Sequence, residues 1–544
     1  MPNGSFNVPF PANEPVLSYA PGTPERRELQ DRLARLAGRP IEIAARIGGR
    51  RVRTGKTAKC VMPHDHAHVL ATWHRCGKPE VGRAIRAALD AHSSWSRTPW
   101  HQRAAILLKA AELLAGPYRQ TINAATMLGQ SKTVVQAEID AACELADFWR
   151  FNPFYMQEIY AQQPESADGE WNYVEHRPLE GFVFAVTPFN FTSIAGNLPT
   201  APALMGNTVV WKPASSAIYS AHFIMEVLEE AGLPPGVINM VPGSGADVGD
   251  PVLESQELAG IHFTGSTEVF KAMWTRIGQN IGRCKYYPRI VGETGGKDFV
   301  FAHASADLPA LVTALVRGAF EYQGQKCSAA SRAFIPASIW PRVRQALLRQ
   351  IAEIRLGDPR DFSNFMGAVI DRGAFETITG YIRQAKRSKD ARILCGGGSS
   401  ARRGYFIEPT VVQALRPDFK LMREEIFGPV LTIWVYRDAQ LDRALELCDL
   451  GSPYALTGAV FARDRAAIAR VTDRLTHAAG NFYINDKPTG AVVGQQPFGG
   501  GRASGTNDKA GSVANLMRWV SPRAIKETFR PPTHFAYPSM LPER

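Results

Sequence analysis

The spacing of apolar residues changes along the chain and separates a helical region from an alternating one. Between residues 79 and 151 apolar positions recur every three or four residues, as at Val81, Ile85 and Leu89, which predicts helices that each bury one face. A helix is expected at 24–37 within an extended N-terminal arm, and another at 131–151. The segments 54–59 and 64–68 are interpreted as loops. The second segment has alternating histidines, His64, His66 and His68, but no neighbouring residues complete a metal-binding set, so no metal is expected.

From residue 181 onward short apolar runs alternate with amphipathic helices. Such runs are typical of parallel strands that are buried on both faces, so we expect an α/β sheet covered by helices. Open sheets of this kind bind ligands at the carboxyl ends of their strands. Polar motifs follow three of the strands there, at 187–190, 212–213 and 264–266, which favours a nucleotide site. The expected strands are 181–186, 207–211, 237–241, 260–263 and 288–291, and the helices between them are 217–231 and 268–281.

The second half of the chain predicts another α/β unit and a loop system. Helices are expected at 308–322 and 340–354, and the glycines at 396–398 are interpreted as a turn. The stretch 481–511 is rich in Gly, Asn, Pro and Gln, and segments this irregular inside an enzyme are usually functional loops. Residues 171–174 have strand character and predict a protruding hairpin. The aromatic tail 514–544 is expected to pack on a partner subunit.

Composition and charge narrow the classes of protein that fit. The chain has 544 residues, 45% of them hydrophobic, which is enough for two or more domains. No apolar run approaches the roughly 20 residues of a membrane span, and no targeting signal is visible at the N-terminus. The net charge of +11 is spread along the chain, whereas a nucleic-acid site concentrates it in a stripe. Seven dispersed cysteines without a CxxC pair argue against disulfides and for a reducing compartment, and we expect the cytoplasm.

Three residues of different types suggest nucleophilic catalysis by a thiol. Cys327 lies among small and polar residues, whereas structural cysteines usually lie in apolar runs. A catalytic thiol needs a base and a donor to the oxyanion. Glu293, followed by Thr-Gly-Gly, and Asn190, within Pro-Phe-Asn-Phe, are the candidates for these roles. Each of the three has an ordinary structural alternative by itself, and their combination favours an active site.

Four motifs, taken in order, resemble those of the aldehyde dehydrogenase superfamily. They are Pro-Phe-Asn-Phe at 188–191, Glu-Thr-Gly-Gly-Lys at 293–297, Gly-Gln-Lys-Cys at 324–327 and Glu-Glu-Ile-Phe-Gly-Pro at 424–429. The resemblance extends from about residue 13 to 528. Further strings at 127–140, 320–322, 327–328 and 495–500 are similar to the branch that oxidises 1-pyrroline-5-carboxylate.

The resemblance implies a fold with three parts. A Rossmann-like NAD-binding domain with a parallel sheet is expected at 1–159 and 182–292, and a second α/β catalytic domain with Cys327 at 293–485. A small β oligomerisation element is expected at 160–181 and 515–544, and a substrate-anchor loop at 486–514. A homodimer or a higher homo-oligomer is implied, without a nucleic-acid or membrane partner.

The resemblance also implies the cofactor and the chemistry. Cys327 would attack an aldehyde to form a thiohemiacetal, with the oxyanion held by Asn190 and the Cys327 N–H. After hydride transfer to NAD⁺, Glu293 would activate the water that hydrolyses the thioester. The family often has an acidic residue where this chain has Ser215. Without that negative charge the 2′-phosphate of NADP⁺ is not repelled. NAD⁺ is the first choice of cofactor, and NADP⁺ stays open as the alternative. The implied cofactor-binding residues are Thr187, Pro188, Phe189, Lys212, Gly245, Phe263, Ser266, Gly295, Glu425 and Phe427.

The implied substrate is L-glutamate γ-semialdehyde, which is oxidised to L-glutamate in the second step of proline catabolism. Ser328 and the N–H groups of Gly490 and Ala491 would anchor its α-carboxylate, and Phe191 and Phe498 would enclose its aliphatic part. Glu144 and Lys326 complete the implied substrate site. Another semialdehyde, such as succinate semialdehyde, is the alternative substrate. A non-catalytic relative is the alternative from a different class, and three intact catalytic residues argue against it.

Overall fold

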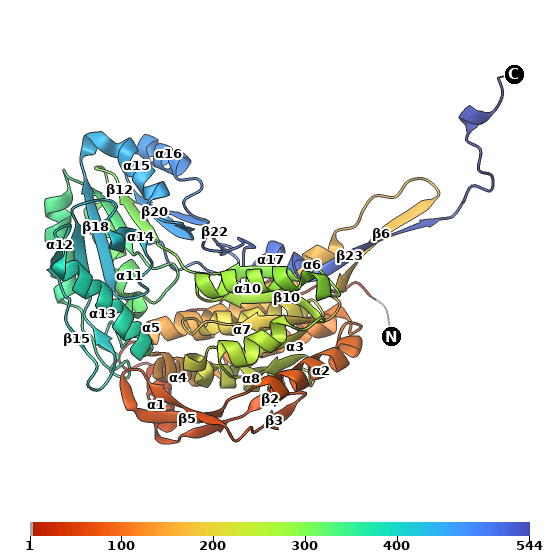
Figure 1. Cartoon of the computed structure of the whole chain (residues 1–544), viewed down its shortest axis with the longest axis horizontal. Helices are drawn as coiled ribbons and strands as arrows, with labels where there is room; N and C mark the ends of the chain where they lie inside the picture. The colour runs from red at the N-terminus through yellow and green to blue at the C-terminus, as the bar shows by residue number, and fades with distance from the viewer. Residues whose placement is uncertain (1–3, 544) are drawn as a thin grey trace.

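A seven-stranded sheet forms the core of one half of the protein, in a computed structural model that describes residues 4–543 (Figure 1). Its order is β11-β10-β7-β8-β9-β2-β3, where β2 is Ala45–Ile47 and β3 is Arg50–Val52. The first five strands are parallel. All five strands expected between residues 181 and 291 are confirmed. They run as continuous apolar stretches because helices cover both faces. Their bounds are Phe182–Val186 for β7, Thr208–Lys212 for β8, Ile238–Met240 for β9, Leu258–Thr264 for β10 and Arg289–Glu293 for β11.

Helices from both sides of this sheet bury the apolar residues whose spacing predicted them. Trp149, Trp211 and Tyr219 are fully buried within the largest core cluster. The helices expected at 24–37, 217–231 and 268–281 are confirmed within one residue at each end. They are α1 (Pro24–Gly38), α8 (Ile218–Ala231) and α10 (Thr267–Asn280), and the other helices of this half are α2 (Lys78–Trp95), α3 (Trp100–Ala115), α4 (Arg119–Gln130) and α7 (Thr192–Leu204).

The helix expected at 131–151 differs from the prediction. A short helix α5 (Val134–Ala137) leads into a π-helical segment η1 (Glu138–Glu144), which continues as α6 (Leu145–Ala161). Pro153 lies inside α6 without ending it. A π-helical turn is rare and is found most often at functional sites, because it changes the direction of the side chains on one turn. Here it faces the cavity described below.

The segments 54–59 and 64–68 are mostly strand, and the prediction of loops there is wrong. They contain the start of β4 (Thr57–Met62) and the start of β5 (Asp65–His74), which pair with each other and with β1 (Ile41–Ile43) in a three-stranded sheet. The two strands are partly solvent-exposed, so polar residues stand on them where a buried strand would be apolar. The three histidines bond to separate partners: His64 to the Ser131 hydroxyl, His66 to the Ala401 carbonyl and His68 to the Ala37 carbonyl.

The second half of the protein is built on another seven-stranded sheet, of order β14-β17-β18-β13-β12-β20-β21. It is parallel except for the edge strand β14. The helix α12 (Trp340–Ala352) is confirmed, while α11 (Leu308–Phe320) ends two residues before the predicted end. Glycines 396–398 connect two strands as expected. The strands are β12 (Phe299–Ala302), β13 (Arg332–Pro336), β14 (Ala391–Cys395), β17 (Thr410–Ala414), β18 (Val430–Tyr436), β20 (Thr457–Phe461) and β21 (Asn481–Ile484), and further helices are α13 (Arg372–Arg387), α15 (Leu441–Leu450) and α16 (Arg465–Arg474).

A two-stranded ribbon projects from the body of the molecule (Figure 1). It pairs β6 (Glu170–Pro178) with β23 (Val520–Thr528) in antiparallel register. The strand expected at 171–174 is therefore confirmed, but its partner comes from the C-terminal region, so it is not a local hairpin. Trp171 on the ribbon and Phe535 and Tyr537 beyond it are 52%, 84% and 69% exposed.

Candidate active site

Cys327 lies in a sharp reversal of the chain between α11 and β13 of the second sheet. Tyr322, Gln323 and Gly324 all have positive φ, at 50°, 57° and 66°. A Cβ atom at Gly324 would lie 2.3 Å from the Gly428 carbonyl oxygen, so only glycine fits there. Backbone strain of this kind clusters at functional sites because the surrounding structure must maintain it. The reversal turns Cys327 toward the other half of the molecule, where it is buried with 7% exposure.

Asn190 reaches the cysteine loop from the first sheet. It belongs to the connection between β7 and α7, and its side-chain amide donates a hydrogen bond of 3.1 Å to the Gln325 carbonyl. Gln130 on α4 also holds this connection, because its side-chain amide donates a hydrogen bond of 2.6 Å to the Phe189 carbonyl. The amide N–H groups of Asn190 are thus directed at the loop that carries Cys327. This placement suits a donor to an oxyanion.

Glu293 is the last residue of β11 and points toward the irregular region after β21. Its carboxylate accepts a hydrogen bond of 3.2 Å from the Gly500 N–H. Burial raises the pKa of Glu293 well above its usual value, although the Gly500 N–H and the nearby Lys509 ammonium act in the opposite direction. A carboxylate with a raised pKa holds a proton more strongly than an ordinary one, which suits a general base.

The Cys327 thiol is protonated in this resting arrangement. Burial raises its pKa well above the usual value, and the carboxylates of Asp298, Glu293 and Glu425 raise it further. Since the thiolate is the nucleophile, the thiol must lose its proton before it attacks. The structure therefore pairs a nucleophile that needs a base with carboxylates close enough to influence it.

One cavity contains Cys327, Glu293 and all seven residues that the sequence suggested for substrate binding. The Ser328 hydroxyl donates to the Thr489 hydroxyl at 2.8 Å, which joins the cysteine loop to the loop of Gly490. Gly490 has φ of 106°, a conformation that favours glycine. The seven residues are Glu144, Phe191, Lys326, Ser328, Gly490, Ala491 and Phe498.

The walls of this cavity differ in charge and polarity. Burial raises the pKa of Glu144 on η1 to about 8, so that wall carries a neutral carboxyl group at pH 7. Lys326 lies 3.1 Å from Glu321, and both line the cavity. Phe191 and Phe498 add apolar surface to the lining. A short ligand with one polar end and one aliphatic segment fits these walls.

A buried ion pair beside the cavity was not predicted. Lys132 Nζ lies 2.6 Å from Asp140 and is stacked between the rings of Phe191 and Tyr322, at 4.3 and 4.6 Å. Asp140 also accepts hydrogen bonds from the first N–H groups of α7. The pair thereby ties the Asn190 connection to the Cys327 loop. No sequence pattern places Lys132 opposite Asp140, because the geometry depends on the π-helical turn.

A second group of residues lies at the strand ends, where a nucleotide was expected. Ser266 caps α10, and its hydroxyl accepts from the Val269 N–H at 3.3 Å. Lys212 ends β8; burial lowers its pKa, and among residues 4–543 its ammonium has no hydrogen-bond or ion-pair partner. Gly245 opens a π-helical turn and is exposed, with space around it. A half-buried cation on the same sheet edge as a capped helix N-terminus fits an anionic dinucleotide.

The remaining expected cofactor residues lie where the two sheets meet. Glu425 accepts a hydrogen bond of 3.0 Å from the Gly296 N–H, and Phe427 meets Phe189 edge-on at 5.8 Å. A Cβ atom at Gly295 would lie 2.0 Å from the Glu425 carboxylate, so this approach requires glycine. Thr187 and Pro188 follow β7 on the same edge, and Phe263 lines the cavity of Cys327. Among the described residues there is no cluster of His, Cys, Asp and Glu side chains that could hold a metal ion.

A cysteine from one α/β unit that meets an amide and a carboxylate from another defines a class of enzyme with a thiol nucleophile. The model of the aldehyde dehydrogenase family matches residues 51–525, and the chain belongs to this family. No helix in residues 4–543 is long and apolar enough to cross a membrane.

The relatives narrow the class further. The chain is 51% identical over 538 residues to the mitochondrial delta-1-pyrroline-5-carboxylate dehydrogenase of Dictyostelium discoideum, covering 98% of this chain and 96% of that protein. It is 52% identical to the delta-1-pyrroline-5-carboxylate dehydrogenase of Agaricus bisporus, covering 99% and 98%. The crystal structure of the Mycobacterium tuberculosis enzyme of that name, bound with NAD, superposes with a TM-score of 0.96 at 55% identity and covers 99% of this chain and 100% of that one.

Proposed function

We propose that the protein oxidises L-glutamate γ-semialdehyde, the open form of 1-pyrroline-5-carboxylate, to L-glutamate with NAD⁺, the second step of proline catabolism. The observation that carries this proposal is the cavity in which Cys327 and Glu293 lie beside Ser328 and Gly490. It provides a nucleophile, a base and main-chain donors for a carboxylate within one enclosure. Relatives at about half identity over nearly their full length carry the corresponding name.

The chemistry follows from the positions of three side chains. The Cys327 thiolate attacks the aldehyde carbon and forms a C–S bond, while Asn190 and the Cys327 N–H stabilise the oxyanion of the thiohemiacetal. NAD⁺, when bound, supplies the acceptor for the hydride that converts this adduct to a thioester. Glu293 then takes a proton from water, whose oxygen attacks the thioester and releases the carboxylic acid and the thiol. Aldehyde, water and NAD⁺ thus give acid, NADH and a proton.

The cofactor contacts are part of the same proposal. Lys212 would meet the ribose hydroxyls of the adenosine. Ser266 and the first turn of α10 would meet the pyrophosphate. Glu425 and Phe427 would hold the nicotinamide ribose and ring. Ser215, whose hydroxyl lies 3.5 Å from the Gly243 carbonyl, adds no negative charge beside the adenosine ribose. The first choice is NAD⁺, with NADP⁺ as the comparison.

Replacing Gly295 by alanine tests the Glu425 contact. The new Cβ would displace the carboxylate, from which it would otherwise be 2.0 Å away. Because a displacement of about 1 Å can cost roughly 10²-fold, we expect kcat/KM for NAD⁺ to fall by about that factor. Isothermal titration with NAD⁺ checks the loss of affinity. Gly278→Ala, at a helical glycine with open space around it, is the control, and equal losses in both variants would contradict the assignment.

The experiment that tests the substrate compares NADH formation with 1-pyrroline-5-carboxylate, succinate semialdehyde and propanal. We expect the first to have the highest kcat/KM. In Ser328→Ala the KM for 1-pyrroline-5-carboxylate should rise roughly tenfold, since a hydrogen bond to a charged group contributes about 1.5–3 kcal/mol. The kcat/KM for propanal, which has no α-carboxylate, should stay within about twofold. A preference for succinate semialdehyde would overturn the anchor assignment, and failure with every aldehyde would favour the non-catalytic alternative.

We also propose a function for each part of the chain. Residues 1–159 and 182–292 would bind NAD⁺, 293–485 would carry the nucleophile, and 486–514 would anchor the substrate. The ribbon and tail, 160–181 and 515–544, would join subunits of a homodimer or higher oligomer, which is supported by the exposed Trp171, Phe535 and Tyr537.

Seven free cysteines support a reducing compartment, for which we propose the cytoplasm. The Dictyostelium relative is named mitochondrial, so imaging of the tagged chain in its own cells decides between the two compartments.

A further inference from the structure

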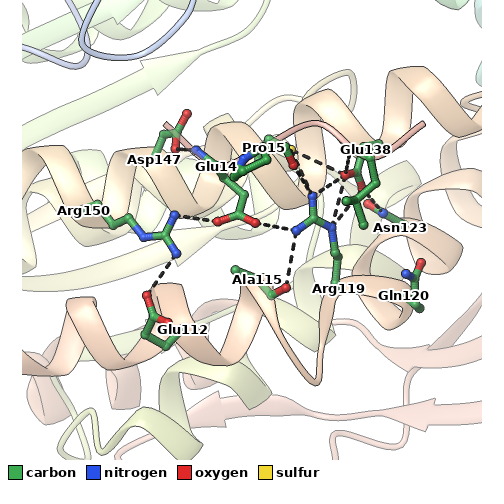
Figure 2. Close-up of polar contacts among 12 residues, drawn as sticks. Glu14, Pro15, Glu112, Ala115, Arg119, Gln120, Asn123, Glu138, Asp147 and Arg150 are labelled. Atoms are coloured by element: carbon green, nitrogen blue, oxygen red, sulfur yellow. Dashed lines mark hydrogen bonds and ion pairs between the residues drawn. The ribbon is translucent and has the colours of Figure 1, made fainter. Parts of the chain in front are cut away.

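The N-terminal arm lies along the helices that form one wall of the active-site cavity. Its residues 13–19 have no regular secondary structure, yet their polar groups bond to residues more than 100 positions away. The Glu14 carboxylate lies between the guanidinium groups of Arg119 on α4 and Arg150 on α6 (Figure 2). The arm is therefore attached to the helical layer through charged groups that are partly or fully removed from water.

The buried carboxylate of Glu138 is the second attachment point. It accepts hydrogen bonds from the Leu17 N–H at 2.9 Å and the Tyr19 hydroxyl at 2.8 Å, both from the arm. It also pairs with Arg119 (Figure 2). Glu138 begins the π-helical segment η1. The next residues of that segment, Ile139, Asp140 and Glu144, line the cavity. One short segment thus contacts the arm through one residue and the cavity through its neighbours.

Asn13 connects the arm to both the helical wall and the substrate-anchor loop. Its amide nitrogen donates to Asp147 on α6 at 2.8 Å and to the Val493 carbonyl at 2.7 Å. Its amide oxygen accepts from the Gln495 side chain at 2.9 Å. The two amide N–H donors and the oxygen acceptor of Asn13 are therefore all used. Two of these three contacts are to the loop that follows Gly490 and Ala491.

This part of the loop fits tightly against α6. A Cβ atom at Gly494 would lie 2.1 Å from the ring of Phe151, so the backbone rests directly on that ring. Phe148, one turn earlier on α6, lines the cavity, as Gly490 and Ala491 do. A shift of residues 493–495 away from α6 would therefore pull on Gly490 and Ala491, which line the cavity.

We propose that Asn13 is a positioning residue for the substrate site: it holds the loop 490–495 against α6, so that the Gly490 and Ala491 N–H groups stay directed at the α-carboxylate. This inference rests on the proposed function, because it assumes that these N–H groups bind a carboxylate. Asn13 does not line the cavity and touches no reacting atom. Its loss affects substrate binding through the loop and leaves Cys327, Asn190 and Glu293 in place.

The test uses the full chain and the variant Asn13→Ala. We expect the KM for 1-pyrroline-5-carboxylate to rise about tenfold, since the three hydrogen bonds of the Asn13 side chain are lost and water replaces them only in part. The kcat should stay within about twofold, and so should kcat/KM for propanal. Asn7→Ala, at an exposed residue of the same arm, is the matched control and should change neither quantity.

Hydrogen–deuterium exchange supplies a readout that does not depend on activity. The N–H groups of Gln495 and Gln496 donate to the Val492 carbonyl, so their exchange reports how firmly the loop is held. They should exchange faster in Asn13→Ala, whereas amides of β7 should not. Unchanged loop exchange, or equal losses of kcat/KM for both aldehydes, would overturn the proposal. If the wild type fails to oxidise 1-pyrroline-5-carboxylate, the proposed function fails, while the exchange experiment still decides whether Asn13 holds the loop.

Discussion

Replacing Cys327 by alanine is expected to lower kcat with 1-pyrroline-5-carboxylate by at least about 10⁴-fold, because removing a nucleophile leaves only binding and oxyanion stabilisation. The cavity contains a single cysteine among its lining residues, so no other lining thiol can replace it. Alanine also removes only the thiol of a buried residue, at a place where the smaller side chain creates no clash. The loss should therefore be chemical and should not reflect unfolding.

The measurement for Cys327→Ala is NADH formation, together with isothermal titration of NAD⁺ to show that the cofactor still binds. Cys284→Ala, at a half-buried free cysteine outside the cavity, is the control and should keep wild-type kcat. Residual activity within about tenfold of the wild type would mean that the hydride is transferred from an adduct that Cys327 does not form. That result would remove the thiol from the mechanism while leaving the fold and the cofactor site unaffected.

The sequence predicted the buried sheets better than the partly exposed elements, and the reason is burial. β7 and β10 are covered on both faces, so each is a continuous apolar run that differs from its flanking segments. β4 and β5 are partly exposed, and their Lys and His residues resemble those of a loop. The ribbon required a partner more than 340 residues away, which local patterning cannot supply.

At the candidate site, too, local sequence patterns did not reveal contacts between side chains that are far apart in the chain. Cys327, Asn190 and Glu293 were found because their motifs are specific, and the structure places the first and last in one cavity and the amide against the cysteine loop. The pairing of Lys132 with Asp140 was missed, since it depends on the extra residue per turn of η1 and on two aromatic rings from distant segments. The contact of Asn13 with Val493 was missed for a related reason, because it spans 480 positions.

Replacing Glu293 by glutamine should separate the two halves of the reaction. The amide keeps the size of the side chain but cannot take a proton from water, and loss of a general base typically costs about 10²–10⁴-fold. Attack by Cys327 and hydride transfer do not need that proton transfer. We therefore expect a rapid burst of about one NADH per chain, followed by steady turnover roughly 10³-fold slower than in the wild type. Stopped-flow absorbance measures the burst, and Glu446→Gln, at an exposed carboxylate of α15, is the control.

The pH dependence of thioester hydrolysis, the slow step, tests the role of Glu293 most directly. Burial raises the pKa of Glu293 well above its usual value, so the carboxyl group loses its proton only at a correspondingly higher pH. Only the deprotonated form accepts a proton, and the rate of thioester hydrolysis should therefore rise with pH through that raised pKa and fall as the pH is lowered. Glu293→Gln should lose this dependence while keeping the burst. If the burst itself disappears in the variant, Glu293 acts earlier, as the base that deprotonates the Cys327 thiol, because that thiol is also protonated at rest.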